Sequence, residues 1–202
     1  MEKYKYTAKT KEAALETALY ELKEEEKNLI CNYEEVKAGL FGKKVQVEVI
    51  KKSDVIDFIK ETVKNITEKM GIEANLEVKQ RGETTNVIIY SEQNAILIGK
   101  QGKNLEALSY IVRQIVKNEI GMTFKFTLDA GAYKLKREKD LIRLAKNLAK
   151  EVQKTKEPIK MDSMNSYERR LVHNALNDWK NISTESEGEE PNRYIVLKYK
   201  EK

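Results

Sequence analysis

Two glycines enclose a lysine and a glutamine at 99–102, between a short apolar segment and a long amphipathic one. Glycine lets the backbone turn tightly because it carries no Cβ atom. Such a turn leaves bare backbone N–H groups at the start of the following helix, where the helix dipole favours an anion. Lys100 and Lys103 add positive charge at the same place. The pattern predicts a phosphate site made by Gly99, Lys100, Gln101, Gly102 and Lys103.

The same four residues also fit a second interpretation, a tight loop between two packed helices that binds no ligand. A Walker A loop is excluded, because the chain lacks the G-x-x-x-x-G-K-[ST] spacing that cradles nucleotide phosphates. Which of these two interpretations is correct depends on the helices and strands on either side of the turn.

Arg169 and His173 form the second group that could contact phosphate. They lie four residues apart, so a helix would place them on one face. A guanidinium fork and an imidazole ring N–H can both donate hydrogen bonds to a phosphate. The alternative interpretation is an exposed helix that carries this pair by chance.

The chain has one cysteine and one histidine, which limits its chemistry. A structural zinc site needs about four nitrogen or sulfur ligands. Cys31 and His173 are far apart in the sequence, and Cys31 is better interpreted as a small core residue. With no convergent acid, base and nucleophile and no cofactor loop, we expect no enzyme, no catalytic residue, no metal site and no cofactor.

Composition favours one to three small domains with heavily solvated surfaces, because 40% of the 202 residues are apolar and 35% are charged. A mean hydropathy of −0.66 and the lack of a long apolar run argue against insertion into a membrane. The N-terminus has no apolar region typical of a signal peptide. A single cysteine cannot form an internal disulfide, so we expect a cytoplasmic protein.

The net charge of +5 is concentrated in the last third of the chain. Residues 129–202 carry 17 basic and 13 acidic side chains, whereas residues 53–128 carry ten of each. An excess of positive charge permits binding to nucleic acid but does not prove it.

Hydrophobic periodicity predicts three units in sequence. Residues 1–51 read as strand, helix, strand, strand, with Thr10 as the helix N-cap. Residues 52–129 read as α-β-β-α-α-β, with the Gly99–Gly102 turn between the last two helices and a final strand over 124–128. Residues 130–202 read as a long helix, a short strand, a helix capped by Asn165 and Glu168, a polar loop over 183–192 and a final strand.

The predicted fold class is therefore α+β, with three small domains that each pack a small sheet against helices. Between the second and third strands of the first unit, Leu40 and Phe41 are flanked by glycines and lysines. A plain hairpin loop rarely exposes such a pair. A packed turn and a contact surface for a partner protein both remain open for it.

The middle unit resembles a type II KH domain, on the order of its elements and on the Gly-Lys-Gln-Gly turn at a helix–helix junction behind Ile96, Leu97 and Ile98. The resemblance implies that the turn clamps a single-stranded backbone while an adjoining apolar groove takes about four unstacked bases. It implies nucleic-acid contacts for Gly99, Lys100, Gln101 and Gly102, and a place in the groove for Ile96 and Ile98.

The other two units also resemble known domains. The Arg-x-x-x-His spacing of Arg169 and His173 resembles the R-three-H domain, whose members bind single-stranded nucleic acid. The first unit resembles the Jag N-terminal domain, whose loop motif is close to Lys37-Ala38-Gly39-Leu40-Phe41-Gly42.

In this order, the three units resemble the Jag/KhpB (EloR) family of bacterial RNA-binding proteins. The resemblance implies a cytoplasmic single-stranded RNA-binding regulator linked to cell elongation and division, with a KhpA-like single-KH protein as partner. The same residues would also fit single-stranded DNA. The alternative is an interaction scaffold for membrane-insertion or cell-wall machinery, in which Leu40 and Phe41 contact membrane-associated cell-wall proteins and RNA binding is incidental.

Overall fold

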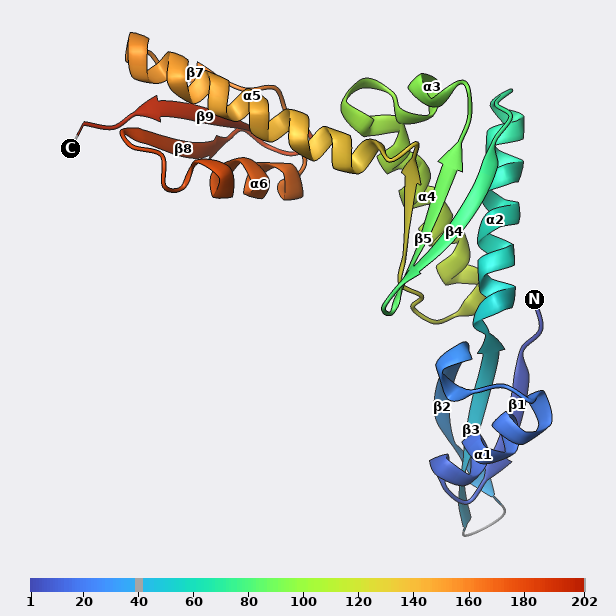
Figure 1. Cartoon of the computed structure of the whole chain (residues 1–202). Coiled ribbons are helices and arrows are strands. Elements are labelled where there is room, and N and C mark those ends of the chain that lie inside the picture. The colour runs from blue at the N-terminus through green and yellow to red at the C-terminus, as the bar shows by residue number, and fades with distance from the viewer. Residues whose placement is uncertain (39–41, 202) are drawn as a thin grey trace. The chain divides into compact units, whose positions relative to one another are not determined.

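The computed structural model describes residues 1–38 and 42–201 and confirms an α+β fold with three small three-stranded sheets (Figure 1). The chain divides into two compact units, Met1–Leu128 and Asp129–Lys202. The expected domain boundaries after residues 51 and 129 stay a prediction.

The first sheet belongs to the N-terminal 51 residues. Its elements are β1 (Tyr4–Ala8), α1 (Lys11–Leu22), a 3-10 turn η1 (Glu26–Asn28), β2 (Leu29–Ala38) and β3 (Gly42–Lys51). The strand order is β1-β3-β2, and both pairs are antiparallel. Thr10 caps α1 as expected, because its Oγ1 accepts a hydrogen bond from the N–H of Ala13 at 3.2 Å. Leu40 and Phe41 lie outside the described residues.

The second sheet follows without a linker, because β3 ends at the residue before α2 (Lys52–Lys69). The remaining elements are β4 (Asn75–Arg81), β5 (Thr84–Tyr90), α3 (Asn94–Ile98), the 3-10 turn η2 (Lys100–Gly102), α4 (Lys103–Ile120) and β6 (Phe126–Ala130), with strand order β4-β5-β6. Burial alternates along β5, so that Val87 and Ile89 enter the core while their neighbours do not. Apolar residues of α2 and α4 complete this core.

One strand of this sheet differs from expectation at its start. The alternation of Phe124, Phe126 and Leu128 predicted a strand over 124–128, whereas β6 begins at Phe126 and runs to Ala130. Phe124 lies before the strand, packs against the core and stacks on Phe126 with ring centroids 6.3 Å apart. An aromatic side chain can therefore extend the apolar pattern to a residue that precedes the strand.

The second unit contains the third sheet. Its elements are α5 (Tyr133–Thr155), β7 (Ile159–Lys160), α6 (Ser166–Leu176), β8 (Ile182–Glu187) and β9 (Tyr194–Tyr199). The strand order is β7-β9-β8, with both pairs antiparallel. The capping box predicted for α6 is present: the Asn165 side chain accepts from the N–H of Glu168 at 3.0 Å, and the Glu168 carboxylate accepts from the N–H of Asn165.

The prediction of a loop over 183–192 was wrong for its first half, which forms β8. The polar sequence Ser183–Glu187 lacks the apolar residues that usually mark a strand. Cross-strand contacts compensate, because Lys198 of β9 forms ion pairs with both Glu185 and Glu187 of β8. No helix among the described residues is long and apolar enough to cross a bilayer.

Candidate nucleic-acid interface

The Gly99–Gly102 turn joins α3 to α4 through a backbone that only glycine adopts easily. Gly99 has φ 68° and ψ −176°, a combination essentially restricted to glycine. A Cβ atom at Gly99 would also lie 2.5 Å from Cγ of Asn104. Gly102 has φ 82° and serves as the N-cap of α4. Both glycines therefore occupy positions that another residue would strain.

Asn104 fixes the angle between the two helices at this turn. Its Nδ2 donates a hydrogen bond to the carbonyl oxygen of Ile96 at 2.9 Å, which ties the first turn of α4 to α3. The N–H of Gly99 donates to the carbonyl of Ala95 at 2.9 Å and closes α3. The missing Cβ of Gly99 is what allows the Asn104 side chain to lie so close. The turn is thus held rigidly from both sides.

The start of α4 has no side-chain cap in the described part of the chain. Ser, Thr, Asp or Asn usually bonds these first N–H groups, and Gly102 has no side chain to do so. Lys100 and Lys103 are exposed on either side of Gly102, and neither has an acidic partner among the described salt bridges. The single acidic residue in the first turn of α4 is Glu106. Positive charge and helix dipole therefore act together at this end.

The predicted residues of this site differ in exposure, with Lys100 and Lys103 the exposed ones. Gly102 is buried, whereas Gly99 and Gln101 are half-buried. Gln101 itself has φ 56°, a left-handed conformation that is uncommon outside glycine and often marks a binding site. Beside the turn, Leu97 enters the core, Ile98 is half-buried and Ile96 is 54% exposed. Ile96 thus presents an apolar surface close to the start of α4.

Arg169 and His173 lie on α6, as predicted, but their polar groups already have partners. Arg169 is only 7% exposed. Its Nη1 donates to the carbonyl oxygen of Met164 at 2.8 Å, and its Nη2 lies 2.8 Å from Oε1 of Glu190. The Glu190 side chain is 58% exposed, so the ion pair that Nη2 forms lies at the surface of the protein.

His173 is held between two hydroxyl groups of β8. Its Nδ1 lies 2.6 Å from Oγ1 of Thr184, and its Nε2 lies 3.1 Å from Oγ of Ser186. Burial lowers the pKa of His173 below its ordinary value, and the positive charge of Arg169 lowers it further. The imidazole is therefore neutral at pH 7, so that one ring nitrogen donates and the other accepts.

Sequence reasoning missed Thr184, Ser186 and Glu190, because it assigned their segment to a loop. Thr184 and Ser186 are two residues apart, which places both side chains on one face of β8. The spacing of these two hydroxyl residues could have indicated a strand in this segment. Arg170, the neighbour of Arg169, is exposed and stays outside this cluster.

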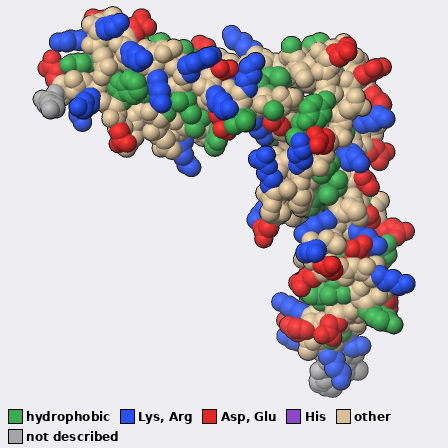
Figure 2. Space-filling view, viewed as in Figure 1, with side chains coloured by type: hydrophobic (Ala, Val, Ile, Leu, Met, Phe, Trp, Pro, Cys, Tyr) green, Lys and Arg blue, Asp and Glu red, His purple; other side chains and the backbone are tan. Residues whose placement is uncertain are grey.

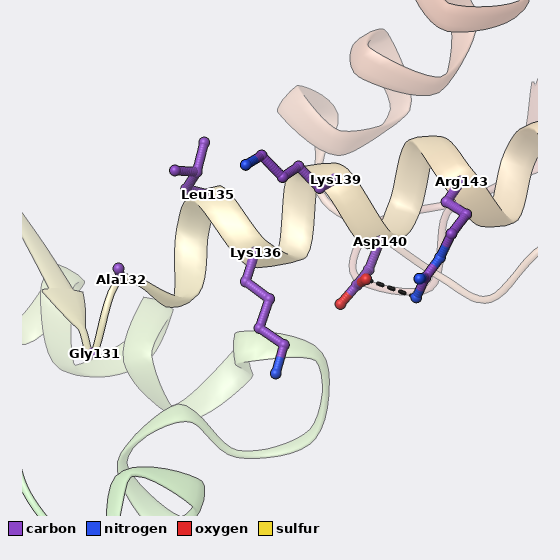
Figure 3. Close-up of a pocket in the computed structure, with 7 residues that line it drawn as sticks. All are labelled: Gly131, Ala132, Leu135, Lys136, Lys139, Asp140 and Arg143. Atoms are coloured by element: carbon purple, nitrogen blue, oxygen red, sulfur yellow. Dashed lines mark hydrogen bonds and ion pairs between the residues drawn. The ribbon is translucent and has the colours of Figure 1, made fainter.

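The remaining reactive groups lie apart from these two sites. Burial raises the pKa of the Cys31 thiol, which disfavours the nucleophilic thiolate. Within the described residues, no cluster of His, Cys, Asp and Glu could hold a metal ion. The first turns of α5 border a shallow depression lined by Gly131, Ala132 and outward side chains from Leu135 to Arg143 (Figure 3).

Two models of known domain families match separate segments of the chain. A model of the KH domain of KhpA and KhpB matches residues 56–127, and a model of the R-three-H domain matches residues 139–199. A Clostridium symbiosum protein named RNA-binding protein KhpB is 33% identical over 96% of this chain and 90% of its own length. The chain belongs to the KhpB family.

Further relatives of the same name extend the comparison. A KhpB of Bacillus subtilis is 36% identical over 80% of this chain and 79% of its own length. A KhpB of Streptococcus pneumoniae is 30% identical over 67% of this chain but only 41% of its own length. The KH match contains the Gly99–Gly102 turn, and the R-three-H match contains Arg169, His173 and their partners on β8. The two candidate sites therefore fall one in each matched domain.

Proposed function

We propose that this chain is a single-stranded RNA-binding regulator without catalytic activity, which holds RNA at the Gly99–Gly102 turn and at the Arg169–His173 pair. Family membership supports RNA as the ligand, because the relatives named above are RNA-binding proteins. The residues of the two sites contact phosphates and bases, which single-stranded DNA also offers, so preference for RNA requires contacts to the 2′-hydroxyl.

The observation that carries the proposal is the uncapped start of α4 between two exposed lysines. A phosphate at this point would accept from main-chain N–H groups and gain from the helix dipole. Because Gly99 and Asn104 fix the turn beforehand, little conformational entropy is lost when RNA binds. The exposed Ile96 and half-buried Ile98 would contact the bases next to that phosphate.

The Arg169–His173 pair would hold a second segment of the same RNA. For Arg169 to bind phosphate, the RNA must displace the exposed carboxylate of Glu190 from Nη2. For His173, the hydroxyl groups of Thr184 and Ser186 set which ring nitrogen carries the proton. Two weak sites on one chain raise overall affinity through effective concentration.

Changing Lys100 and Gln101 to Asp tests the proposal. The two carboxylates, one at an exposed position and one at a half-buried position, should repel phosphate. We expect affinity for a single-stranded oligoribonucleotide to fall by at least about tenfold, as for loss of one or two charged contacts. A matched variant with Lys64→Asp and Gln114→Asp makes the same changes at exposed helix positions and should bind normally. Equal affinity of the two variants, with both folded, would reject the turn as the site.

The proposal includes the biological setting that the family resemblance implies. We place the protein in the cytoplasm, because its single cysteine cannot form an internal disulfide. We further propose post-transcriptional control linked to cell elongation and division. RNA crosslinked to the protein in cells and then sequenced should be enriched in transcripts for those processes.

A KhpA-like single-KH partner is supported by the outer surface of α4. Ile111 and Ile115, one helical turn apart and 48% and 37% exposed, form a short apolar strip on a helix whose other side enters the core. Tyr110, next to Ile111 in the sequence, is 64% exposed. Such a strip is typical of a surface that another protein covers. Light scattering on a mixture with a single-KH protein should give a heterodimer, and Ile111→Asp should abolish it.

The scaffold alternative rests on this same apolar strip and on the Leu40–Phe41 loop. If protein contact is the main activity, cell-wall or membrane-insertion proteins should co-purify with the chain after RNase treatment. Loss of that co-purification on replacing Leu40 and Phe41, with no effect of the Lys100 and Gln101 changes, would favour the scaffold.

A further inference from the structure

A stripe of six basic residues runs along the outer surface of α5. They are Lys136, Lys139, Arg143, Lys146, Lys150 and Lys154, and we call them the α5 stripe. Each follows the last by three or four residues, so all six lie on one face of the helix. The stripe is about 27 Å long at about 1.5 Å per residue. Figure 2 shows Lys and Arg gathered over this helix.

The stripe lies opposite the face by which α5 joins its own core. Leu141, Ala145, Ala149 and Val152 of α5 are buried, whereas all six stripe residues are exposed. The flank of α5 that meets α6 is made by other residues: Nε of Arg137 donates to Glu168 at 2.7 Å, and Glu138 accepts from the hydroxyl of Tyr167 at 2.8 Å. The stripe therefore has no part in holding the second unit together.

The stripe is poorly neutralised by acidic residues. Among the described salt bridges, only Arg143 of the stripe has a partner, Asp140 at 2.9 Å. Figure 3 shows that pair, with Lys136 and Lys139 extending from the turn before it. Elsewhere basic residues do pair, as Lys198 does with Glu185 and Glu187. The acidic residue flanking the far half of the stripe is Glu151.

This arrangement works against helix stability. Like charges three or four residues apart destabilise an isolated helix, and the stripe contains five such steps in succession. A solvated helix face normally alternates positive and negative charges. A long row of one sign is a feature that binding explains and folding does not.

We propose that the α5 stripe is a third RNA-binding surface, which holds the phosphodiester backbone without reading sequence. The inference rests on the proposed function and adds to its two local contacts a row of phosphate contacts along α5. Five of the six residues are lysines, which act as point charges and contact phosphates without specifying a base. No aromatic side chain lies within the stripe to stack on a base.

RNA fits the α5 stripe better than a membrane or a protein does. A helix that lies on a bilayer inserts an apolar face into it, whereas the apolar face of α5 is buried in the core and its two exposed leucines, Leu135 and Leu144, lie nine residues apart. Protein–protein interfaces are depleted of lysine and enriched in aromatic residues, the reverse of what the stripe offers. A polyanion with regularly spaced charges is the partner that matches a regular row of cations.

The test removes four charges from the stripe with Lys139→Gln, Arg143→Gln, Lys146→Gln and Lys150→Gln in the full chain. Glutamine keeps the helix propensity of the residues it replaces. The matched control removes four exposed charges elsewhere, with Lys9→Gln, Lys27→Gln, Lys64→Gln and Lys69→Gln, and has the same net charge. Each protein is titrated with single-stranded oligouridylate of about four nucleotides, which the KH turn can hold alone, and of about five times that length.

We expect the stripe variant to lose affinity for the long RNA by about tenfold or more at about 50 mM salt. The slope of log K against log salt should become shallower by about 2 to 3, because each lost phosphate contact contributes about 0.7. Affinity for the short RNA should stay unchanged. The melting temperature should stay equal or rise, since repulsion within α5 is relieved.

An unchanged slope, or an equal loss in the control, would overturn the inference. So would normal binding to long RNA with lost binding to vesicles that contain phosphatidylserine, since the stripe would then serve a membrane. Failure of the proposed function would give a different result. In that case the short RNA would bind the Lys100→Asp, Gln101→Asp variant as tightly as the unchanged chain.

Discussion

The Gly99–Gly102 turn and the Arg169–His173 pair were predicted to bind the same group, a phosphate, but they differ in what occupies them. The turn presents an uncapped helix start between two exposed lysines. The pair is satisfied from within: Arg169 bonds Met164 and Glu190, and both ring nitrogens of His173 meet hydroxyl groups of β8. At the turn, no described side chain caps α4, whereas Arg169 would have to release Glu190 before it could bind a phosphate.

The two motifs therefore differ in whether their residues also hold the fold together. At the turn, the glycines remove side-chain atoms, and the N–H groups of Gly102 and Lys103 bond the carbonyl oxygens of Gly99 and Lys100 within the turn itself. At the pair, His173 bonds β8 and Arg169 bonds the β8–β9 connection. Changes at the turn should therefore act mainly on binding, and changes at the pair should act first on stability.

The largest expected effect is that of Gly99→Ala. Its Cβ would lie 2.5 Å from Asn104, and its backbone would remain in a region that alanine avoids. We expect a loss of about 2 to 4 kcal/mol in the free energy of unfolding, measured by urea denaturation. Gly82→Ala is the matched control, since φ is also positive there but nothing lies within 4 Å, and it should cost about 1 kcal/mol. Equal costs at the two positions would show that Asn104 moves freely and that the turn is not fixed.

Arg169→Met should have the next largest effect, on stability. Methionine keeps an unbranched apolar stem, though a shorter one, and leaves the carbonyl of Met164 without its donor. We expect a loss of about 1 to 3 kcal/mol in the free energy of unfolding. Arg170→Met, one residue along and exposed, should stay within about 0.5 kcal/mol. If Arg169→Met is neutral for stability but abolishes RNA binding, the contrast between the two sites disappears.

Glu190→Gln should have a smaller effect and the opposite sign for binding. Removing the negative charge weakens the hold of this side chain on Nη2 of Arg169 while costing less than about 1 kcal/mol in stability, because the pair is partly exposed. We expect affinity for a long single-stranded RNA to rise severalfold, with Glu189→Gln unchanged as control. Weaker binding of the Glu190→Gln variant would mean that the carboxylate positions Arg169 instead of competing with RNA.

The smallest expected effect is the pH dependence that His173 contributes. Burial lowers its pKa in the folded chain below the ordinary 6.5, so the unfolded chain binds the proton first as pH falls. Stability is therefore fully present above about 6.5 and is lost as pH drops from there toward the lower folded pKa. Because His173 is the only histidine, one NMR titration of the ring protons measures that pKa directly. A value above 6.5 in the free protein would contradict the buried, neutral imidazole.

The sequence predicted the parts of the fold that depend on periodicity and on capping. The apolar spacing of α2 and α4, the N-cap at Thr10 and the capping box of α6 all follow from local rules, and the structure confirms them. The turn between α3 and α4 was predictable for the same reason, because its glycines and the helices beside it are contiguous in the chain.

The parts that could not be predicted depend on contacts between distant segments. The strand β8 is polar, and it forms because Lys198 and His173 supply partners from β9 and α6. The burial of Arg169 depends on Glu190, which lies 21 residues away in a segment assigned to a loop. Helical spacing showed that Arg169 and His173 share a face, but it could not show what covers that face.

The central claim is that main-chain N–H groups at the start of α4 hold a phosphate. The most direct test is a titration of the nitrogen-15-labelled chain with oligouridylate of about four nucleotides, followed by amide NMR. We expect the amide signals from Gly99 to Asn104 to move most, and to stay in place in the Lys100→Asp, Gln101→Asp variant. Binding that shifts signals elsewhere and leaves those amides unmoved would contradict it.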